Sequence, residues 1–254
     1  MRPVDSSILM ALATCTWCTT LALSPITTSR SDYFFSDELG RVRIFHGAAR
    51  VQKNPPWYFA DLLEGDVEPQ LMSQLGFNVL RLGFMWSGYN PAPGIFNATY
   101  MEVIKATVAK LNSHGIHVLL DMHQDILSSK FCLYDGVPRW VIDKSEPAHA
   151  YPYPLAKPDG NNCTRTDSPR SPCNCSRSWS ENALTVAAAT AYQDIYDNKH
   201  GMLDDLAAFW KRAASELRDI PGIIGYEVGT LPSRPPPCAP SSVIHAFRAE
   251  PSPR

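Results

Sequence analysis

One stretch constrains the fold of this chain more than any other, and it reads GIHVLLDMHQDILSSKFC over residues 115–132. Its first part, Ile116 to Leu120, is a short aliphatic run of the kind that is buried on both faces of a parallel sheet. Polar residues follow at once. Ligands of α/β sheets and α/β barrels bind at the carboxyl ends of the strands, so we expect His123 and Asp125 to contact a substrate. The alternative is a structural histidine that makes its hydrogen bonds inside the protein.

Strand-like and helix-like segments alternate along the chain. Strands are expected in residues 42–47, 78–82, 116–120 and 223–228, and helices, with apolar residues at helical spacing, in residues 67–75, 103–111, 183–196 and 202–217. A hairpin turn at residues 36–40 precedes the first strand. This order is typical of parallel βαβ units. A closed barrel needs eight strands, so the sequence predicts an α/β fold of the (β/α)8 TIM-barrel class, truncated to about the first four βα units.

Composition excludes several classes of partner. The 254 residues carry a net charge of -2 and 44% hydrophobic residues, which suits a globular domain without a basic surface for nucleic acid. No stretch of about 18 uninterrupted apolar residues predicts a transmembrane segment. Cys173 and Cys175 lack the second pair or the histidines of a structural zinc site. We therefore expect no nucleic acid, no membrane span, no metal and no cofactor.

The first residues resemble a targeting segment. Arg2 precedes a moderately apolar stretch, and Ala22-Leu23-Ser24 has small residues at positions 22 and 24, where a secretory peptidase would cut. We predict a signal peptide over residues 1–24, with a disordered leader as the alternative. Three glycosylation sequons, at Asn97, Asn162 and Asn174, agree with export. The protein is therefore expected to be a glycoprotein that is secreted or lysosomal.

Removal of residues 1–24 would take Cys15 and Cys18 away and leave five cysteines in an oxidising compartment. Four of them could form two disulfides in any of three pairings, namely Cys132, Cys163, Cys173 and Cys175. Cys238 has no evident partner. It lies in the Pro-rich residues 229–254, which we predict to be a divergent, disordered tail after a domain of residues 25–228.

Four segments together resemble the amino-terminal half of glycoside hydrolase family 5. They are Phe45 to Gly47, Asn78 to Gly83 with Trp86 after it, His114 to Asp125, and Ile224 to Val228. More narrowly, the LDMHQD run and the helix around residues 200–203 resemble endoglycoceramidases. The resemblance covers about residues 33–228. It implies a retaining β-glycosidase that releases the glycan from the ceramide of a glycosphingolipid, so the expected ligand is a glycosphingolipid or another β-glycoside.

The resemblance also implies roles for individual residues. Arg81 would organise the floor of the site, and Lys53, His123 and Asp125 would bond the first sugar, while Trp86 is a candidate sugar platform. These residue types suit the task, because sugar hydroxyls need paired donors and acceptors, and a guanidinium can hold a carboxylate ionised. Each has an alternative: a structural ion pair for Arg81, a solvated loop charge for Lys53 and a core aromatic for Trp86.

The chain departs from the family where the chemistry would take place. In the family the fourth strand continues into Asn-Glu-Pro, whose glutamate is the general acid/base, whereas residues 229–232 read GTLP and put Leu231 at that position. Glu227 belongs to the strand itself, and the nucleophile would come from a seventh strand that the sequence lacks. Retaining hydrolysis needs two carboxyl groups about 5–5.5 Å apart. We therefore expect no catalytic residue to be retained and the chain to be inactive.

Three interpretations follow from the sequence. The chain is an inactive member of the endoglycoceramidase type, or a secreted half-domain that binds glycolipid or a partner without chemistry, or a chain that does not fold stably alone. Half a barrel leaves its outer strands unpaired and its interior uncovered, so self-association through exposed sheet edges is expected.

Overall fold

A parallel sheet forms the centre of the computed structural model, which describes residues 23–28, 33–125, 127–131, 136–145 and 185–229. The sheet has the strand order β4-β5-β6-β7, all parallel, with the strands β4 (Gly47–Arg50), β5 (Val79–Gly83), β6 (His117–Asp121) and β7 (Ile223–Glu227). Each strand pairs with the next one along the chain. The predicted βαβ alternation is confirmed, and these four strands correspond to half of an eight-stranded barrel.

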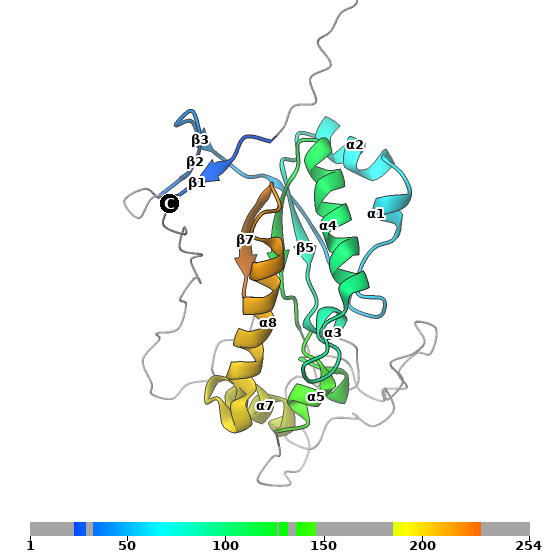
Figure 1. Ribbon diagram of the computed structural model, residues 1–254, viewed down its shortest axis with the longest axis vertical. Helices are drawn as coiled ribbons and strands as arrows, with labels where there is room; N and C mark the ends of the chain where they lie inside the picture. The colour runs from blue at the N-terminus through cyan, green and yellow to red at the C-terminus, as the bar shows by residue number, and fades with distance from the viewer. Residues whose placement is uncertain (1–22, 29–32, 126, 132–135, 146–184, 230–254) are drawn as a thin grey trace, which may run out of the picture.

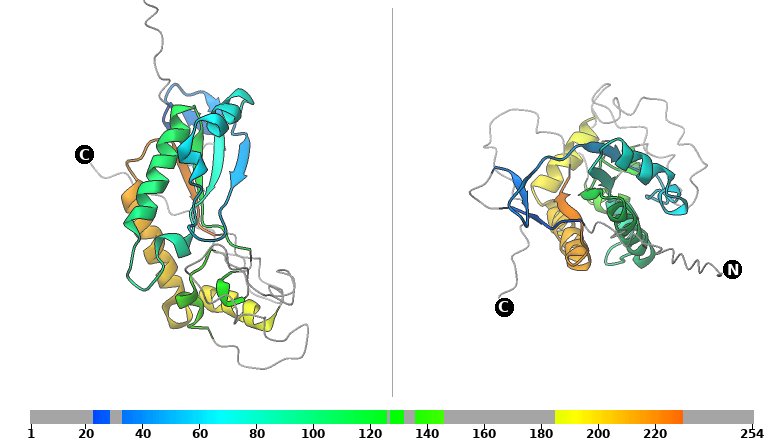
Figure 2. Two further views of the ribbon diagram at one scale, coloured as in Figure 1. Left: turned by 90° about the vertical axis from the view of Figure 1, so that its right-hand side faces the viewer. Right: turned by 90° about the horizontal axis from the view of Figure 1, so that it is seen from above.

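Helices connect the strands and lie against the sheet. The longest, α4 (Ala98–Ser113) and α8 (Met202–Leu217), run along the same face of the sheet (Figure 1), and the turned views of Figure 2 show the same arrangement. The shorter ones are α1 (Asp61–Glu64), α2 (Val67–Gln74), α3 (Trp86–Tyr89), α5 (Arg139–Ile142), α7 (Val186–Tyr196) and the 3-10 turns Ser129–Phe131 and Lys199–Gly201. The carboxyl ends of the strands point toward α5 and α7 (Figure 1).

The two faces of the sheet differ in chemistry because side chains alternate along each strand. Leu80 and Leu82 of β5, like Val118 and Leu120 of β6, are buried and belong to the same hydrophobic core as the inner faces of α4 and α8. The alternate residues, Arg81 of β5 and Leu119 and Asp121 of β6, point to the opposite face. The polar side chains that concern function therefore share the inner face of the incomplete barrel.

Local sequence signals explain where α4 lies. The side chain of Asn97 accepts a hydrogen bond from the backbone N–H of Tyr100 at 3.0 Å, which caps the helix at its start. At the other end Gly115 adopts a φ of 79°, a left-handed conformation that glycine reaches without strain, and the chain then enters β6. These two signals set where α4 begins and ends, and therefore where the chain enters β6, which lies between β5 and β7 in the sheet.

The predicted hairpin is confirmed, but the prediction for the first parallel strand was wrong. A small antiparallel sheet holds β1 (Ile26–Thr27), β2 (Phe35–Asp37) and β3 (Val42–Arg43), and the parallel strand β4 begins at Gly47, where we expected the strand to end. Its small residues have weak strand propensity and gave no signal. Glycine is required at position 47, because a Cβ there would lie 1.7 Å from the carbonyl oxygen of Val79.

Several predicted features lie outside the described residues. They are almost all of the signal peptide, the tail from residue 230 onward with Leu231 and Cys238, two sequons, and the four disulfide candidates Cys132, Cys163, Cys173 and Cys175. Within the residues that the structure describes, no helix combines the length and the apolar character needed to cross a bilayer. No group of three or more ligating side chains in the same residues is arranged to hold a metal ion.

Candidate active site

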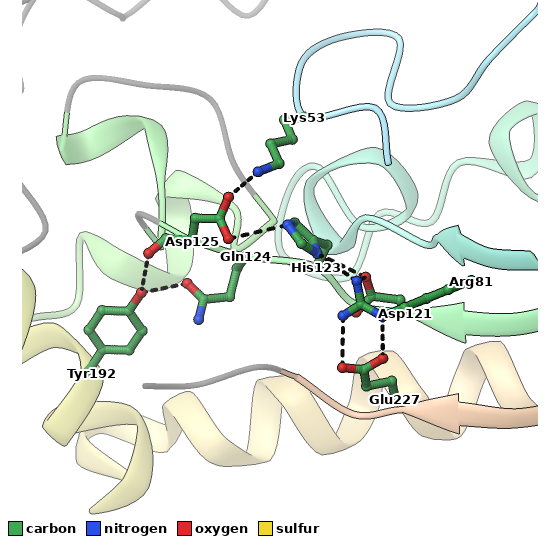
Figure 3. Close-up of polar contacts among 8 residues, drawn as sticks. All are labelled: Lys53, Arg81, Asp121, His123, Gln124, Asp125, Tyr192 and Glu227. Carbon is green, nitrogen blue, oxygen red and sulfur yellow. Dashed lines mark hydrogen bonds and ion pairs between the residues drawn. The ribbon is translucent and has the colours of Figure 1, made fainter. Parts of the chain in front are cut away.

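The register of the parallel strands brings three charged side chains together at the carboxyl end of the sheet. Asp121 is the last residue of β6, and it pairs in register with Gly83 of β5 and with Glu227 of β7. Arg81 precedes Gly83 by two residues, so its side chain lies on the same face as those of Asp121 and Glu227. Figure 3 shows these side chains meeting at the ends of the strands.

Arg81 binds both neighbouring carboxylates. Its Nε and Nη2 donate to the two oxygens of Glu227 at 2.6 and 2.8 Å, a bidentate pairing, and its Nη1 lies 2.9 Å from Oδ2 of Asp121. The side chain of Asp121 is fully buried. Hydrogen bonding from Arg81, which outweighs the effect of partial burial, lowers the pKa of Glu227 below its usual range. The guanidinium therefore keeps Glu227 ionised and fixes the positions of both carboxylates.

His123 extends this network away from the strands. Its Nδ1 lies 2.9 Å from Oδ2 of Asp121 and its Nε2 lies 3.3 Å from Oδ1 of Asp125, so each ring nitrogen faces a carboxylate. The hydrogen bond to Asp121 raises the pKa of His123 despite the opposing effect of burial. Both nitrogens can donate only in the imidazolium form, which is the form that this arrangement favours.

Lys53, in the loop that follows β4, completes the network by pairing with Oδ2 of Asp125. Burial alone would raise the pKa of Asp125, but the hydrogen bond from Lys53 and the charge of His123 outweigh it, and the pKa is lowered. Negatively and positively charged side chains therefore alternate from the end of β7 to the loop that follows β4. We call this set the charge ladder; its members are, in order, Glu227, Arg81, Asp121, His123, Asp125 and Lys53.

The middle of the charge ladder and its Lys53 end differ in what they can do. In the middle, Asp121 is buried and paired with two cations, so it serves to orient its neighbours. At the end formed by Lys53 and Asp125, the side chains are 47% and 39% exposed, and a ligand can reach them. An ammonium group and a carboxylate side by side offer both donors and acceptors, which is what a sugar hydroxyl needs. The lowered pKa values of Asp125 and Glu227 make both poor proton donors at neutral pH.

Four of the five substrate-binding residues predicted from the sequence come together in this ladder: Lys53, Arg81, His123 and Asp125. The fifth, Trp86, does not. It begins the short helix α3 rather than lying in a loop, its side chain is fully buried, and it packs on Phe209 with ring centroids 5.5 Å apart. Its indole N–H donates to Asn90 at 3.2 Å. Trp86 is a core aromatic, and its assignment as a sugar platform is corrected.

The structure adds two carboxylates that the sequence did not assign to the site, Asp121 and Glu227. Each is the last residue of its strand, and that shared position was the available signal. It also adds Gln124 and Tyr192: the Tyr192 hydroxyl lies 2.6 Å from Oε1 of Gln124, although 68 residues separate them. Of the predicted glycosylation sites, Asn97 is described, and it lies at an exposed position at the start of α4.

Comparisons with known proteins identify the family of this chain. The model of the family described as Cellulase (glycosyl hydrolase family 5) matches residues 59–229. The endoglycoceramidase of Cyanea nozakii is 38% identical over 198 residues, which make up 76% of this chain and 39% of that protein. The endoglycoceramidase of Hydra vulgaris is 36% identical over 223 residues, which make up 82% of this chain and 42% of that protein.

A solved structure shows the same similarity in three dimensions. The crystal structure of endogalactoceramidase matches with a TM-score of 0.60 and 25% identity, covering 82% of this chain and 44% of that one. This chain therefore spans about two fifths of the length of the curated relatives that it matches. The family model covers most of the described barrel strands and the charge ladder from Arg81 to Glu227. The chain belongs to glycosyl hydrolase family 5 and is of the endoglycoceramidase-like type.

Proposed function

We propose that this chain carries the sugar-binding half of an endoglycoceramidase-type active site, and that alone it binds a β-glycoside without cleaving it. The substrate class is that of the relatives named endoglycoceramidase; one related enzyme structure is described as a ganglioside GM3 complex. The single observation that carries the proposal is the exposed end of the charge ladder. Lys53 and Asp125 stand there as a donor and an acceptor pair, backed by His123.

The absence of turnover follows from the state of the carboxylates. A retaining glycosidase needs an acid that gives up a proton and a nucleophile about 5–5.5 Å away. Each carboxylate of the charge ladder is instead paired with a cation, and those of Glu227 and Asp125 have lowered pKa values. At the position that the family resemblance assigns to the acid/base, the sequence has Leu231, which cannot transfer a proton. Loss of the acid/base alone typically costs about 10²–10⁴-fold in rate.

The binding part is tested with methyl β-lactoside as a soluble probe, by titration calorimetry. Asp125→Asn removes the charge that holds Lys53 and His123 in place, so affinity should fall. Asp219→Asn is the matched control, because the side chain of Asp219 is 89% exposed and has only a distant ion pair with Arg218 at 3.6 Å. Equal affinities in the unaltered chain and Asp125→Asn would contradict the proposal.

The catalytic part is tested by incubating the chain with a short-chain lactosylceramide analogue and measuring the ceramide released. Release should stay near background. Release well above background that is lost in Glu227→Gln would overturn the assignment and make Glu227 a candidate acid.

We also propose that the protein enters the secretory pathway and is N-glycosylated. The support is the apolar leader, the three sequons, and the exposed position of Asn97, whose side-chain oxygen can keep capping α4 when its nitrogen carries a glycan. Expression in a secretory host should give a species whose mobility shifts on treatment with an N-glycan-removing enzyme. A cytosolic, unmodified chain would contradict this.

Self-association with a second copy is the third part of the proposal. Among the described residues, β4 and β7 each pair with a neighbour on one side only, and α2 with the residue after it exposes Val67, Leu71 and Leu75. Open edges and aligned apolar side chains favour association. Light scattering after size exclusion should give a mass above 28.2 kDa that falls on dilution, whereas a monodisperse monomer at all concentrations would contradict the idea.

A further inference from the structure

Tyr192 reaches the sugar site from a helix that contributes no member of the charge ladder. It lies on α7, and its hydroxyl is 2.6 Å from Oε1 of Gln124 and 3.1 Å from the carbonyl oxygen of Asp125 (Figure 3). Both partners belong to the segment directly after β6. The tyrosine thus contacts the backbone of Asp125 on the side away from the carboxylate that faces Lys53 and His123.

Burial makes this contact strong. Gln124 is 1% exposed and Tyr192 is 7% exposed, so water does not compete for the hydroxyl as it would at the surface. Removing a donor from a buried acceptor leaves the acceptor's desolvation uncompensated. The hydroxyl hydrogen is shared between the side-chain oxygen of Gln124 and the backbone carbonyl of Asp125, and this restrains the backbone at Asp125.

A second contact holds the same segment from another direction. Gly136 lies so close to His123 that a Cβ on it would come within 2.0 Å of the His123 carbonyl oxygen. The carbonyl of Gly136 in turn accepts from the backbone N–H of Ser87 at 2.7 Å. Residues 123–125 are therefore held between the loop at Gly136 and the hydroxyl of Tyr192.

The position of the Asp125 carboxylate depends on these contacts with its backbone. The carboxylate lies 3.3 Å from Nε2 of His123 and also pairs with Lys53, and its side chain is partly exposed, so ion pairing in water holds it only weakly. A fixed backbone limits where the carboxylate can go. We propose that Tyr192 is a positioning residue of the sugar site, which acts through Asp125 and has no contact with the sugar. This inference rests on the proposed function.

A double-mutant cycle tests the route of action. Tyr192→Phe should weaken binding of methyl β-lactoside about tenfold, within the range measured for coupled neighbours. In the Asp125→Asn background the same change should add no more than about twofold, because the group that it positions is already lost. Tyr196→Phe is the matched control: it removes the same hydroxyl one turn later on α7, from a side chain that is 42% exposed, and affinity should not change. Equal losses in both backgrounds would overturn the inference.

A titration without sugar separates this inference from the proposed function. The ring of His123 is followed by NMR, with its signal assigned by comparison with His123→Gln. The groups that face it are Asp121, Asp125 and Arg81, with Lys53 and Glu227 beyond. In Tyr192→Phe the Asp125 carboxylate should move away from Nε2, so the pKa of His123 should fall, while Tyr196→Phe leaves it unchanged.

The outcomes are distinct. If the unaltered chain binds no β-glycoside but the pKa of His123 falls in Tyr192→Phe, the proposed function fails and the positioning role stands. If the chain binds sugar but neither readout responds to Tyr192→Phe, the positioning role fails and the proposed function stands. Should Tyr192→Phe not fold, Gln124→Met replaces it: the hydroxyl then donates to the carbonyl of Asp125 alone, so the sugar affinity and the pKa of His123 should be kept. A loss of both in Gln124→Met would show that the effect runs through Gln124 and would overturn the inference.

Discussion

Replacing Arg81 with methionine tests how much the inner face depends on one side chain. Methionine fills much of the same volume but leaves Glu227 without its cation and Asp121 with His123 as its remaining partner. The guanidinium makes contacts of 2.6 and 2.8 Å to Glu227 and one of 2.9 Å to Asp121. Asp121 is fully buried, and removing one partner of a buried pair typically costs about 3–5 kcal/mol.

Glu227 contributes less to that loss because its side chain is 29% exposed and water can solvate it. Glu227→Gln should accordingly cost only about 1.5–3 kcal/mol, the scale of a charged hydrogen bond, since Arg81 then still serves Asp121. We expect the free energy of unfolding to fall by about 3–5 kcal/mol in Arg81→Met. For a domain of this size that corresponds to a melting temperature lower by about 6–20 °C.

Urea denaturation followed by tryptophan fluorescence measures these differences. Lys105→Met serves as the control, because Lys105 pairs with the exposed Glu102 at 3.0 Å on the surface of α4 and should cost less than about 0.5 kcal/mol. Should Arg81→Met lose no more stability than Lys105→Met, the view that the guanidinium stabilises the inner face would be refuted. A loss equal to that of Glu227→Gln would show that Asp121 does not depend on Arg81.

Three further predictions concern pH, the core and a close backbone approach. The pKa of His123 is raised in the folded state, so its stabilising contribution is present below the unfolded value of about 6.5 and is lost as pH rises through the folded value. The stability difference between the chain and His123→Gln should therefore be larger at pH 6 than at pH 9; a difference independent of pH would contradict this. Ile104→Ala should cost about 2–5 kcal/mol in urea denaturation, and exposed Ile95→Ala less than about 0.5 kcal/mol. Gly136→Ala should lower both the melting temperature and the sugar affinity because of its approach to His123, whereas Gly65→Ala, which meets no atom within 4 Å, should change neither.

The sequence was informative where the signal was local. The buried run before Asp121 and the helical spacing in α4 and α8 predicted three of the parallel strands and their order, since alternation of strands and helices leaves few topologies. The start of β4 was missed because its residues, GAAR, have no strand propensity, and the neighbouring Val42 to Phe45 has more. The close approach of the backbone at Gly47 to that at Val79 accounts for the small residue at the start of that strand.

The site was predictable in part for the same reason. His123 and Asp125 follow their strand directly, so their place at its carboxyl end could be read from the sequence. The partner of Arg81 could not, since 146 residues separate it from Glu227 and only strand register brings them together. Trp86 was ambiguous because a tryptophan after a strand suits a core as well as a sugar platform, and burial against Phe209 decided it.

The alternation of charges along the ladder has a consequence for how a ligand arrives. With His123 protonated, three carboxylates face three cations, so their fields cancel within a few ångströms of the site. The Debye length at physiological salt is about 8 Å, and the net charge of the whole chain is only -2. Long-range steering therefore contributes little to encounter, and the association rate of a neutral sugar should hardly change with ionic strength. Under the proposed function, recognition therefore begins at contact, where a sugar hydroxyl meets Lys53 and Asp125.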